Sequence, residues 1–165
     1  LLTAECVGDW IELDFPATPA EPIEAPAGLS DLLGSVPKFV GRSRFDLLLE
    51  LTDAEELRDL NPDFAGLSSL PVRGLIVTAK SDVPDFDFLS RFFAPAAGIN
   101  EDPVTGSLNA GLAMWLIRSG MMKDRYVASQ GTILGRKGRV YVEKRGEDIW
   151  VGGDVIICVD GQVTV

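Results

Sequence analysis

Alternating apolar and polar residues mark several strands along the chain. Residues 10–15 (WIELDF) place apolar and acidic side chains in turn, which is the period of a half-buried β-strand. A Gly8-Asp9 turn precedes them, so residues 4–15 are predicted to form a hairpin. Further strands are predicted over 39–51, 74–79 and 86–93, followed by a run of hairpins from residue 126 onward.

A proline-rich segment interrupts this pattern early in the chain. Residues 16–26 hold four prolines and three alanines, and proline cannot donate a hydrogen bond to a β-ladder. The segment is therefore predicted to be an extended linker and a lobe boundary. We divide the chain into a terminal hairpin of a largely absent first lobe (1–16), a linker (17–28) and a second lobe (29–165). Residues 1–5 read like the inside of a strand and lack an initiator Met, so we expect a fragment, a processed product or a partly ordered chain.

The sequence predicts fewer helices than strands. A short helix is predicted over 29–33, and Thr52-Asp53-Ala54-Glu55 reads as a capping box that begins a helix over 53–60. Residues 106–118 predict a third helix, which carries no charge over 107–117 and is therefore expected to be buried. Many strands joined by tight turns indicate an α+β protein, whose mainly antiparallel β-sheet curls around this central buried helix.

Composition narrows the functional classes. The 165 residues are enough for one domain or two small lobes, and 25 acidic against 15 basic residues give a net charge of −10. Such a charge repels phosphate groups, so nucleic acid and anionic membrane are poor partners. No apolar run approaches the roughly 18 residues of a membrane span, and no signal peptide is recognisable.

Histidine is absent from the sequence, which excludes a Ser-His-Asp triad, a Cys-His pair and a His-rich zinc site. Proton transfer near neutral pH would then use a carboxylate, a thiol, a tyrosine, a lysine or water. Cys6 and Cys158 lie at opposite ends of the chain without CxxC spacing. They are predicted to be reduced core thiols of a cytoplasmic protein, with a single disulfide between them as the alternative.

The segment before the central helix carries the candidate chemistry. The first amides of a helix have no intrahelical acceptor, and the helix dipole favours an anion there. A glycine in the first turn would let a ligand approach the backbone, neighbouring hydroxyls would add donors, and acidic residues precede them. The candidate residues are Asn100, Glu101, Asp102, Thr105, Gly106 and Ser107. A structural alternative is that Asp102 only caps the helix, with Pro103 at its first position.

The stretch 88–115, above all FFAP at 92–95 and GINEDPVTGS at 98–107, resembles the signature of the PhzF family of phenazine biosynthesis-like isomerases. Further agreement comes from the DFP strand end at 14–16, the capping-box helix, and three later segments: QGT at 130–132, GRVYV at 138–142 and IWVGG at 149–153. The resemblance implies a fold related to diaminopimelate epimerase. Two lobes each curl around a central helix, and the substrate lies between the N-termini of the two helices.

The resemblance also assigns roles to residues. It implies that Asp102, the Ser107 hydroxyl and the amides of Gly106 and Ser107 bind and polarise the substrate, with Asp102 as the catalytic residue. The family's general base is a first-lobe glutamate near a Gly-Asn-Pro motif, and a Gly-His-Ala-Thr motif supplies the second helix start; neither motif is in this sequence. The family usually has histidine where this chain has Asn109, and its Arg-Gly-Gly turn is altered here to Arg136-Lys137-Gly138.

The implied activity is an isomerisation or epimerisation of a small anionic carboxylic acid without metal or organic cofactor, by a cytoplasmic homodimer. Because the first-lobe base is not in these residues, the chain alone is expected to be inactive. The alternative is a non-catalytic module that binds a small acid or a protein partner. Intact mass distinguishes the two, since a mass near that of a two-lobed protein favours the enzyme.

Overall fold

The computed structural model describes residues 3–8, 10–17, 19–156, 158–159 and 161–162. Over these residues an eleven-stranded sheet runs in the order β1-β2-β11-β10-β9-β7-β6-β5-β4-β3, with β8 paired to β7. The strands are β1 (Ala4–Val7), β2 (Trp10–Pro16), β3 (Glu21–Pro22), β4 (Phe39–Arg42), β5 (Asp46–Glu50), β6 (Gly74–Lys80), β7 (Phe88–Ala94), β8 (Ile99–Asp102), β9 (Arg125–Gln130), β10 (Gly138–Arg145) and β11 (Asp148–Asp154). The helices are α1 (Leu29–Leu33), α2 (Ala54–Asp59), α3 (Phe64–Leu67), the 3-10 turn η1 (Pro95–Ala97) and α4 (Gly106–Arg118). The predicted α+β class with a mainly antiparallel sheet is confirmed.

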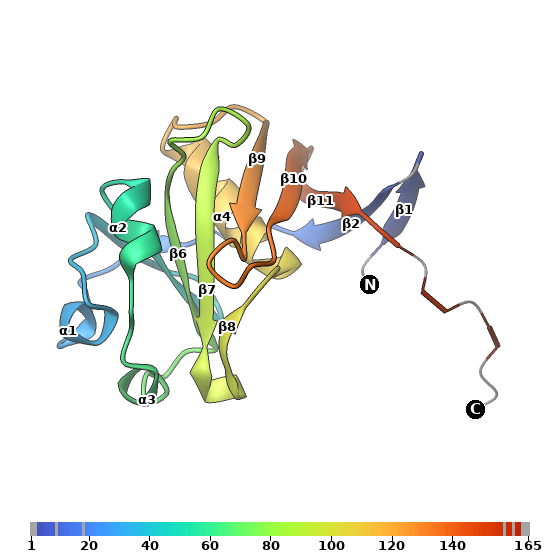
Figure 1. Ribbon diagram of the computed structural model, residues 1–165. Helices are drawn as coiled ribbons and strands as arrows, with labels where there is room; N and C mark the ends of the chain where they lie inside the picture. The colour runs from blue at the N-terminus through green and yellow to red at the C-terminus, as the bar shows by residue number, and fades with distance from the viewer. Residues whose placement is uncertain (1–2, 9, 18, 157, 160, 163–165) are drawn as a thin grey trace.

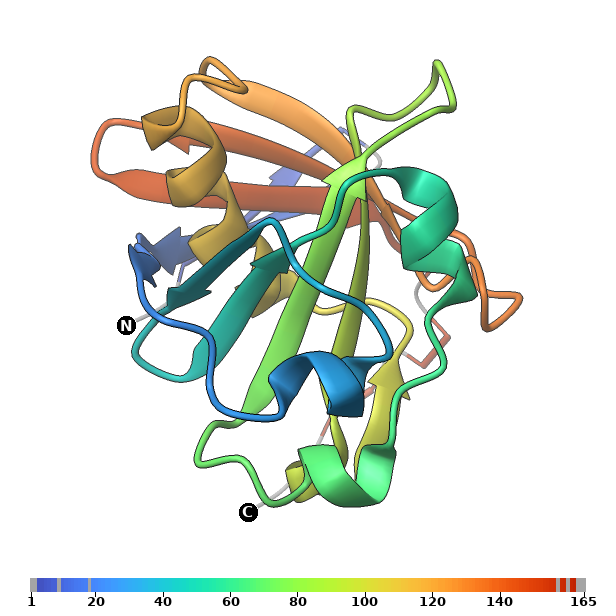
Figure 2. The ribbon, with the colours of Figure 1, turned by 90° about the vertical axis from the view of Figure 1, so that its left-hand side faces the viewer.

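Two apolar clusters pack on opposite faces of the central strands. Phe92 of β7 belongs to the cluster around α4, whereas its neighbour Phe93 belongs to the cluster around α1, α2 and α3. Ile76 and Val77 of β6 divide in the same way, as expected where successive side chains of a strand point to opposite faces. Figures 1 and 2 accordingly show α4 on one side of β6 and β7, and the three short helices on the other.

The helix α4 has the predicted bounds, and eight of its 13 residues are buried. Its large side chains, such as Leu112 and Leu116, belong to the same cluster as Val142 of β10 and Ile149 of β11. A helix without charge over residues 107–117 thus packs against the sheet without leaving a charged group in the core. The curling of the sheet around this helix stays a prediction.

The helix α2 begins at Ala54, one residue after the start that the capping box predicted. Asp53 is the N-cap and accepts a hydrogen bond from the Glu56 amide at 2.9 Å. The Glu56 side chain returns to accept one from the Thr52 amide at 3.0 Å. The cap therefore involves Asp53 and Glu56, one residue later than predicted, and the return hydrogen bond comes from the residue before the N-cap and not from the N-cap amide of a standard capping box.

The N-terminal hairpin forms as expected, with Val7 opposite Trp10; Asp9 of its predicted turn and residues 1–2 lie outside the described residues. Its second strand β2 also pairs with β11, so the hairpin continues the same sheet and extends from one end of it in Figure 1. Within the predicted linker, Glu21 and Pro22 form the short edge strand β3.

The prediction that both cysteines lie in the core is wrong. Cys6 and Cys158 are free and exposed. Cys6 lies on β1, whose four residues are all exposed at the end of the sheet, where nothing among the described residues covers them. Among the described residues, no helix combines the length and the apolar character that crossing a membrane requires.

Candidate active site

Asp102 and Thr105 are joined at the start of α4. The Thr105 hydroxyl donates to Asp102 Oδ2 at 2.5 Å, and both side chains are half-buried. Thr105 is the N-cap of α4, yet its side chain makes no capping hydrogen bond. The alternative in which Asp102 caps the helix with Pro103 at its first position is therefore wrong, because α4 begins only at Gly106. The Asp102 carboxylate is free of the helix start and is held by a hydroxyl instead.

Gln130, at the end of β9, holds this loop from the neighbouring strand. Its Nε2 donates to the Asp102 carbonyl at 2.8 Å and to Thr105 Oγ1 at 3.2 Å, while its Oε1 accepts from the Thr105 amide at 3.1 Å. The side chain is buried, so these three hydrogen bonds satisfy groups that water does not reach. Gln130 thereby fixes both residues that position the Asp102 carboxyl group.

Arg73 brings a positive charge to the first turn of α4. Its Nη1 donates to Ser107 Oγ at 3.3 Å, and its Nε donates to Asp46 Oδ1 at 2.9 Å. A second contact joins Arg73 Nη2 and Asp46 Oδ2, which makes the ion pair bidentate. The hydrogen bonds to Asp46 raise the pKa of Arg73 above its ordinary value. The guanidinium also lies 5.6 Å from the ring centroids of both Phe45 and Phe92.

The sheet topology explains this placement. β5 and β6 pair in parallel, with Asp46 opposite Gly74, so both strands begin at the same edge. Asp46 is the first residue of β5, and Arg73 directly precedes β6. A crossover through α2 and α3 links the two strands, as parallel pairing requires.

A cavity of about 240 Å³ opens at this point. Ser107, Arg73 and Asp46 supply its polar wall, while Phe15 and Phe45 supply apolar ones. The Phe15 ring lies 3.2 Å from where a Cβ on Gly106 would stand, so glycine at this position lets the ring approach the helix start. The cavity can hold a small molecule against the first turn of α4.

The structure brings some predicted site residues together and separates others. Ser107 lines the cavity, and Gly106 and Thr105 occupy the adjoining turn, whereas Asp102 does not line the cavity. Asn100 is exposed on β8. Glu101 forms a bidentate ion pair with Arg91, at 2.9 and 2.7 Å, in which each side chain is 7% exposed. Glu101 thus holds β8 to the sheet and lies apart from the cavity.

Sequence reasoning missed three residues of the site: Arg73, Asp46 and Gln130. A signal for the first two existed, since a helix between two apolar strands is typical of a parallel crossover that aligns their starts. Gln130 stands out in the sequence only as part of a motif, with no sign of its contacts. Among the described residues, no group of three Cys, Asp or Glu side chains is placed to hold a metal ion.

Chemically, the arrangement combines anion-binding groups with a carboxyl group. The free amides of the first helical turn, the Ser107 hydroxyl and the Arg73 guanidinium favour a negatively charged ligand group. The Asp102 carboxyl group lies three residues before the N-cap and accepts one hydroxyl donor. Over the part of the chain that the structure describes, this carboxylate is in no ion pair, and a positioned carboxylate is a group that general acid–base catalysis uses.

Comparison with known proteins gives a consistent result. An uncharacterized isomerase of Halalkalibacterium halodurans is 40% identical over 164 residues, covering 99% of this chain and 61% of that protein. The mouse phenazine biosynthesis-like domain-containing protein 1 is 30% identical over 181 residues, covering 99% of this chain and 62% of that protein. The chain thus spans about three fifths of the length of these relatives.

Solved structures agree in fold. A PhzF family protein of Enterococcus faecalis superimposes with a TM-score of 0.84 at 30% identity, over 98% of this chain and 60% of that one. A PhzC/PhzF protein of Clostridium difficile gives a TM-score of 0.81 at 31% identity, over 98% and 61%. Residues 14–161 match the family described as phenazine biosynthesis-like protein, PhzC-PhzF. The chain therefore belongs to the PhzC-PhzF family of phenazine biosynthesis-like proteins.

Proposed function

We propose that the complete protein is an isomerase that moves a proton on a small carboxylic acid without metal or organic cofactor. The observation that carries the proposal is the start of α4, where Ser107 and Arg73 line a cavity and where Asp102, which does not line it, is held by the hydroxyl of the N-cap residue Thr105. Several relatives, among them that of Halalkalibacterium halodurans, are named isomerases, which supports the same reaction class.

The substrate carboxylate would lie against Ser107 and the free amides of α4. Removing a proton next to a carboxylate places negative charge on its oxygens, and fixed donors aimed at those oxygens lower the barrier. Arg73 is suited to this role because its guanidinium is always charged and donates to Ser107 at the wall of the cavity. The cavity size of about 240 Å³ fits a compact acid.

Asp102 would deliver or accept the second proton of the reaction. The family resemblance assigns the first proton transfer to a glutamate in the part of the relatives that precedes these residues. In this proposal residues 29–165 form the second lobe and residues 1–16 complete the first, with the sheet of the second lobe curled around α4. The pairing of β2 with β11 supports close contact between the two.

Deuterium uptake tests the reaction class even while the substrate is unidentified. The complete protein is incubated in D2O with a set of small carboxylic acids, and mass spectrometry detects acids that gain one mass unit. We expect uptake by at least one acid, unchanged after treatment with EDTA. Binding of an acid without uptake would favour the alternative of a non-catalytic small-acid-binding module, and uptake only after a cofactor is added would contradict the proposal.

The family resemblance also supports a homodimer, and two free cysteines are consistent with a reducing, cytoplasmic location. Sedimentation of the complete protein tests the first point. A monomer at micromolar concentration would contradict it.

A further inference from the structure

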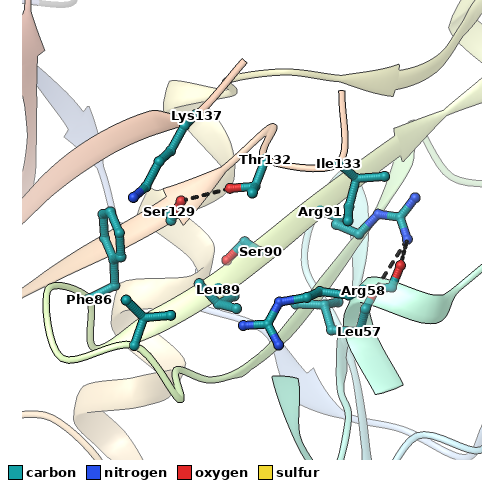
Figure 3. Close-up of a pocket in the computed structure, with 11 residues that line it drawn as sticks. Leu57, Arg58, Phe86, Leu89, Ser90, Arg91, Ser129, Thr132, Ile133 and Lys137 are labelled. Atoms are coloured by element: carbon teal, nitrogen blue, oxygen red, sulfur yellow. Dashed lines mark hydrogen bonds between the residues drawn. The ribbon is translucent and has the colours of Figure 1, made fainter. Parts of the chain in front are cut away.

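A second cavity, of about 190 Å³, lies on the side of β7 that faces α2 (Figure 3). Leu57 of α2, Leu89 of β7 and Phe86 of the β6–β7 loop form apolar walls, and Ile133 of the β9–β10 loop adds another. This cavity shares no lining residue with the cavity that Ser107 and Arg73 line, although Lys137 also lines a third cavity, which includes Gly106. The proposed isomerase reaction does not use it.

Cationic groups border the cavity on two sides. Figure 3 shows Lys137 beside Phe86 at one side and Arg58 at the other. The Lys137 ammonium lies 5.0 Å from the centre of the Phe86 ring, and no carboxylate of the described residues lies within ion-pair distance of it. Arg58 is paired with the exposed Asp82, an interaction that raises the pKa of Arg58.

The remaining polar groups of the cavity already have partners. Ser129 and Thr132 are hydrogen-bonded to each other at 3.2 Å. Arg91 is bound to Glu101 and also donates to the carbonyls of Leu57 and Leu60, at 3.1 and 2.8 Å. A ligand would therefore meet an apolar interior with one free cation at its rim, and the free cation is Lys137 as far as the described residues show.

We propose that this cavity binds a small carboxylic acid with a compact apolar body, of the size of a single aromatic ring. A cavity of about 150 Å³ accommodates benzene, so the present volume suits one ring with a substituent. The ring would contact Leu57, Leu89 and Ile133, and its carboxylate would pair with Lys137. The local cation is needed because the chain carries a net charge of −10, which otherwise repels anions.

Titration of the complete protein with benzoate, benzyl alcohol and benzylamine tests the proposal, with amide chemical shifts as the readout. We expect benzoate to shift amides in residues 83–89 and 129–137 and to bind about tenfold more tightly than benzyl alcohol, because only benzoate pairs with Lys137. Benzylamine should bind more weakly than either. Equal affinities for benzoate and benzyl alcohol would overturn the proposal.

Matched variants locate the site. Lys137→Gln should weaken benzoate binding about tenfold and leave benzyl alcohol binding unchanged, whereas Lys123→Gln, a change at an exposed lysine that does not line the cavity, should change neither. Ile133→Trp should fill the cavity and abolish binding of both compounds, and the 48% exposure of Ile133 makes the change tolerable for folding. Unchanged benzoate affinity in both Lys137→Gln and Ile133→Trp would overturn the proposal. Shifts confined to residues 105–111 would also overturn it, while leaving the proposed isomerase intact.

Discussion

Arg73 connects three parts of the molecule, since it pairs with Asp46 of β5, donates to Ser107 of α4 and directly precedes β6. We predict that Arg73→Gln lowers the free energy of unfolding by about 1–3 kcal/mol, because it leaves the Asp46 carboxylate, 5% exposed, without its partner. The loss stays below that of a fully buried pair since the Arg73 side chain is 39% exposed. Urea denaturation measures it, and the double variant with Asp46→Asn should recover part of the loss. An unchanged stability would contradict the assigned pairing.

Glu101 stabilises the fold through its buried ion pair with Arg91. We predict that Glu101→Gln destabilises the protein by about 3 kcal/mol, since it leaves a buried guanidinium with carbonyl partners alone. Glu147→Gln, a change at an exposed acid, is the control and should have little effect. Thermal denaturation gives the comparison. Equal midpoints for the two variants would show that the ion pair contributes nothing.

The burial of Tyr126 predicts that the stability of the folded protein falls at high pH. It is buried, and burial raises its pKa above the ordinary value of 10.0. The folded state therefore keeps the proton while the unfolded chain loses it, so this contribution to stability is complete below pH 10 and is lost as pH rises above that value. Tyr126→Phe removes the ionisable group and also the hydrogen bond to Asn109 Oδ1 at 3.4 Å.

The measurement is urea denaturation of both proteins between about pH 8 and pH 11. The free energy of unfolding of the wild type should fall towards, and then below, that of Tyr126→Phe as the pH passes about 10. A difference that stays constant over this range would contradict the burial of the ionisable hydroxyl.

At the scale of elements, the turn between β9 and β10 is shaped by its glycines. Gly131 has φ +80°, and a Cβ there would lie 2.5 Å from the Pro103 carbonyl oxygen and also collide with that of Arg136. Gly135 has φ +69° but open space around its Cβ position. We predict that Gly131→Ala lowers the free energy of unfolding by about 3 kcal/mol or more. Gly135→Ala should lower it by only about 1 kcal/mol, because alanine there has an unfavourable backbone conformation but no steric clash. Chemical denaturation of both variants compares them, and equal losses would contradict the close packing of this turn on the site loop.

The same elements show how far sequence reasoning reaches. The bounds of α4 were predictable because an uncharged run with glycine and alanine among large residues is characteristic of a buried helix. The hairpin at 4–15 followed from its period-two pattern. These are local signals, and they place Asp102 and Thr105 correctly before a helix that begins at Gly106.

The other residues of the site depend on contacts between different strands, which the local sequence pattern does not predict. Arg73 and Asp46 are 27 positions apart and meet only because β5 and β6 pair in parallel, whereas tight turns elsewhere suggested antiparallel neighbours. Glu101 looked available for a ligand because its partner Arg91 belongs to another strand. Such partners depend on strand order, which local patterns do not contain.

At the scale of the whole molecule, the sheet separates two apolar clusters, and each proposed binding cavity lies on a different side of it. Both cavities border a basic side chain, Arg73 in one and Lys137 in the other, in a protein of net charge −10. Although the protein is acidic overall, each cavity thus has a local positive charge that favours a small acid. The Asp102 carboxyl group does not line the cavity at α4, but the hydroxyl of the N-cap residue of the same helix holds it.

The rate of deuterium uptake by an identified substrate, compared between the complete wild-type protein and Asp102→Asn, tests the central claim most directly. We predict a loss of at least about 100-fold with an unchanged circular dichroism spectrum, because general acid–base groups contribute that much or more. Asp124→Asn, which alters an exposed carboxylate beyond the end of α4, should retain the full rate. Uptake by Asp102→Asn at the wild-type rate would contradict the account.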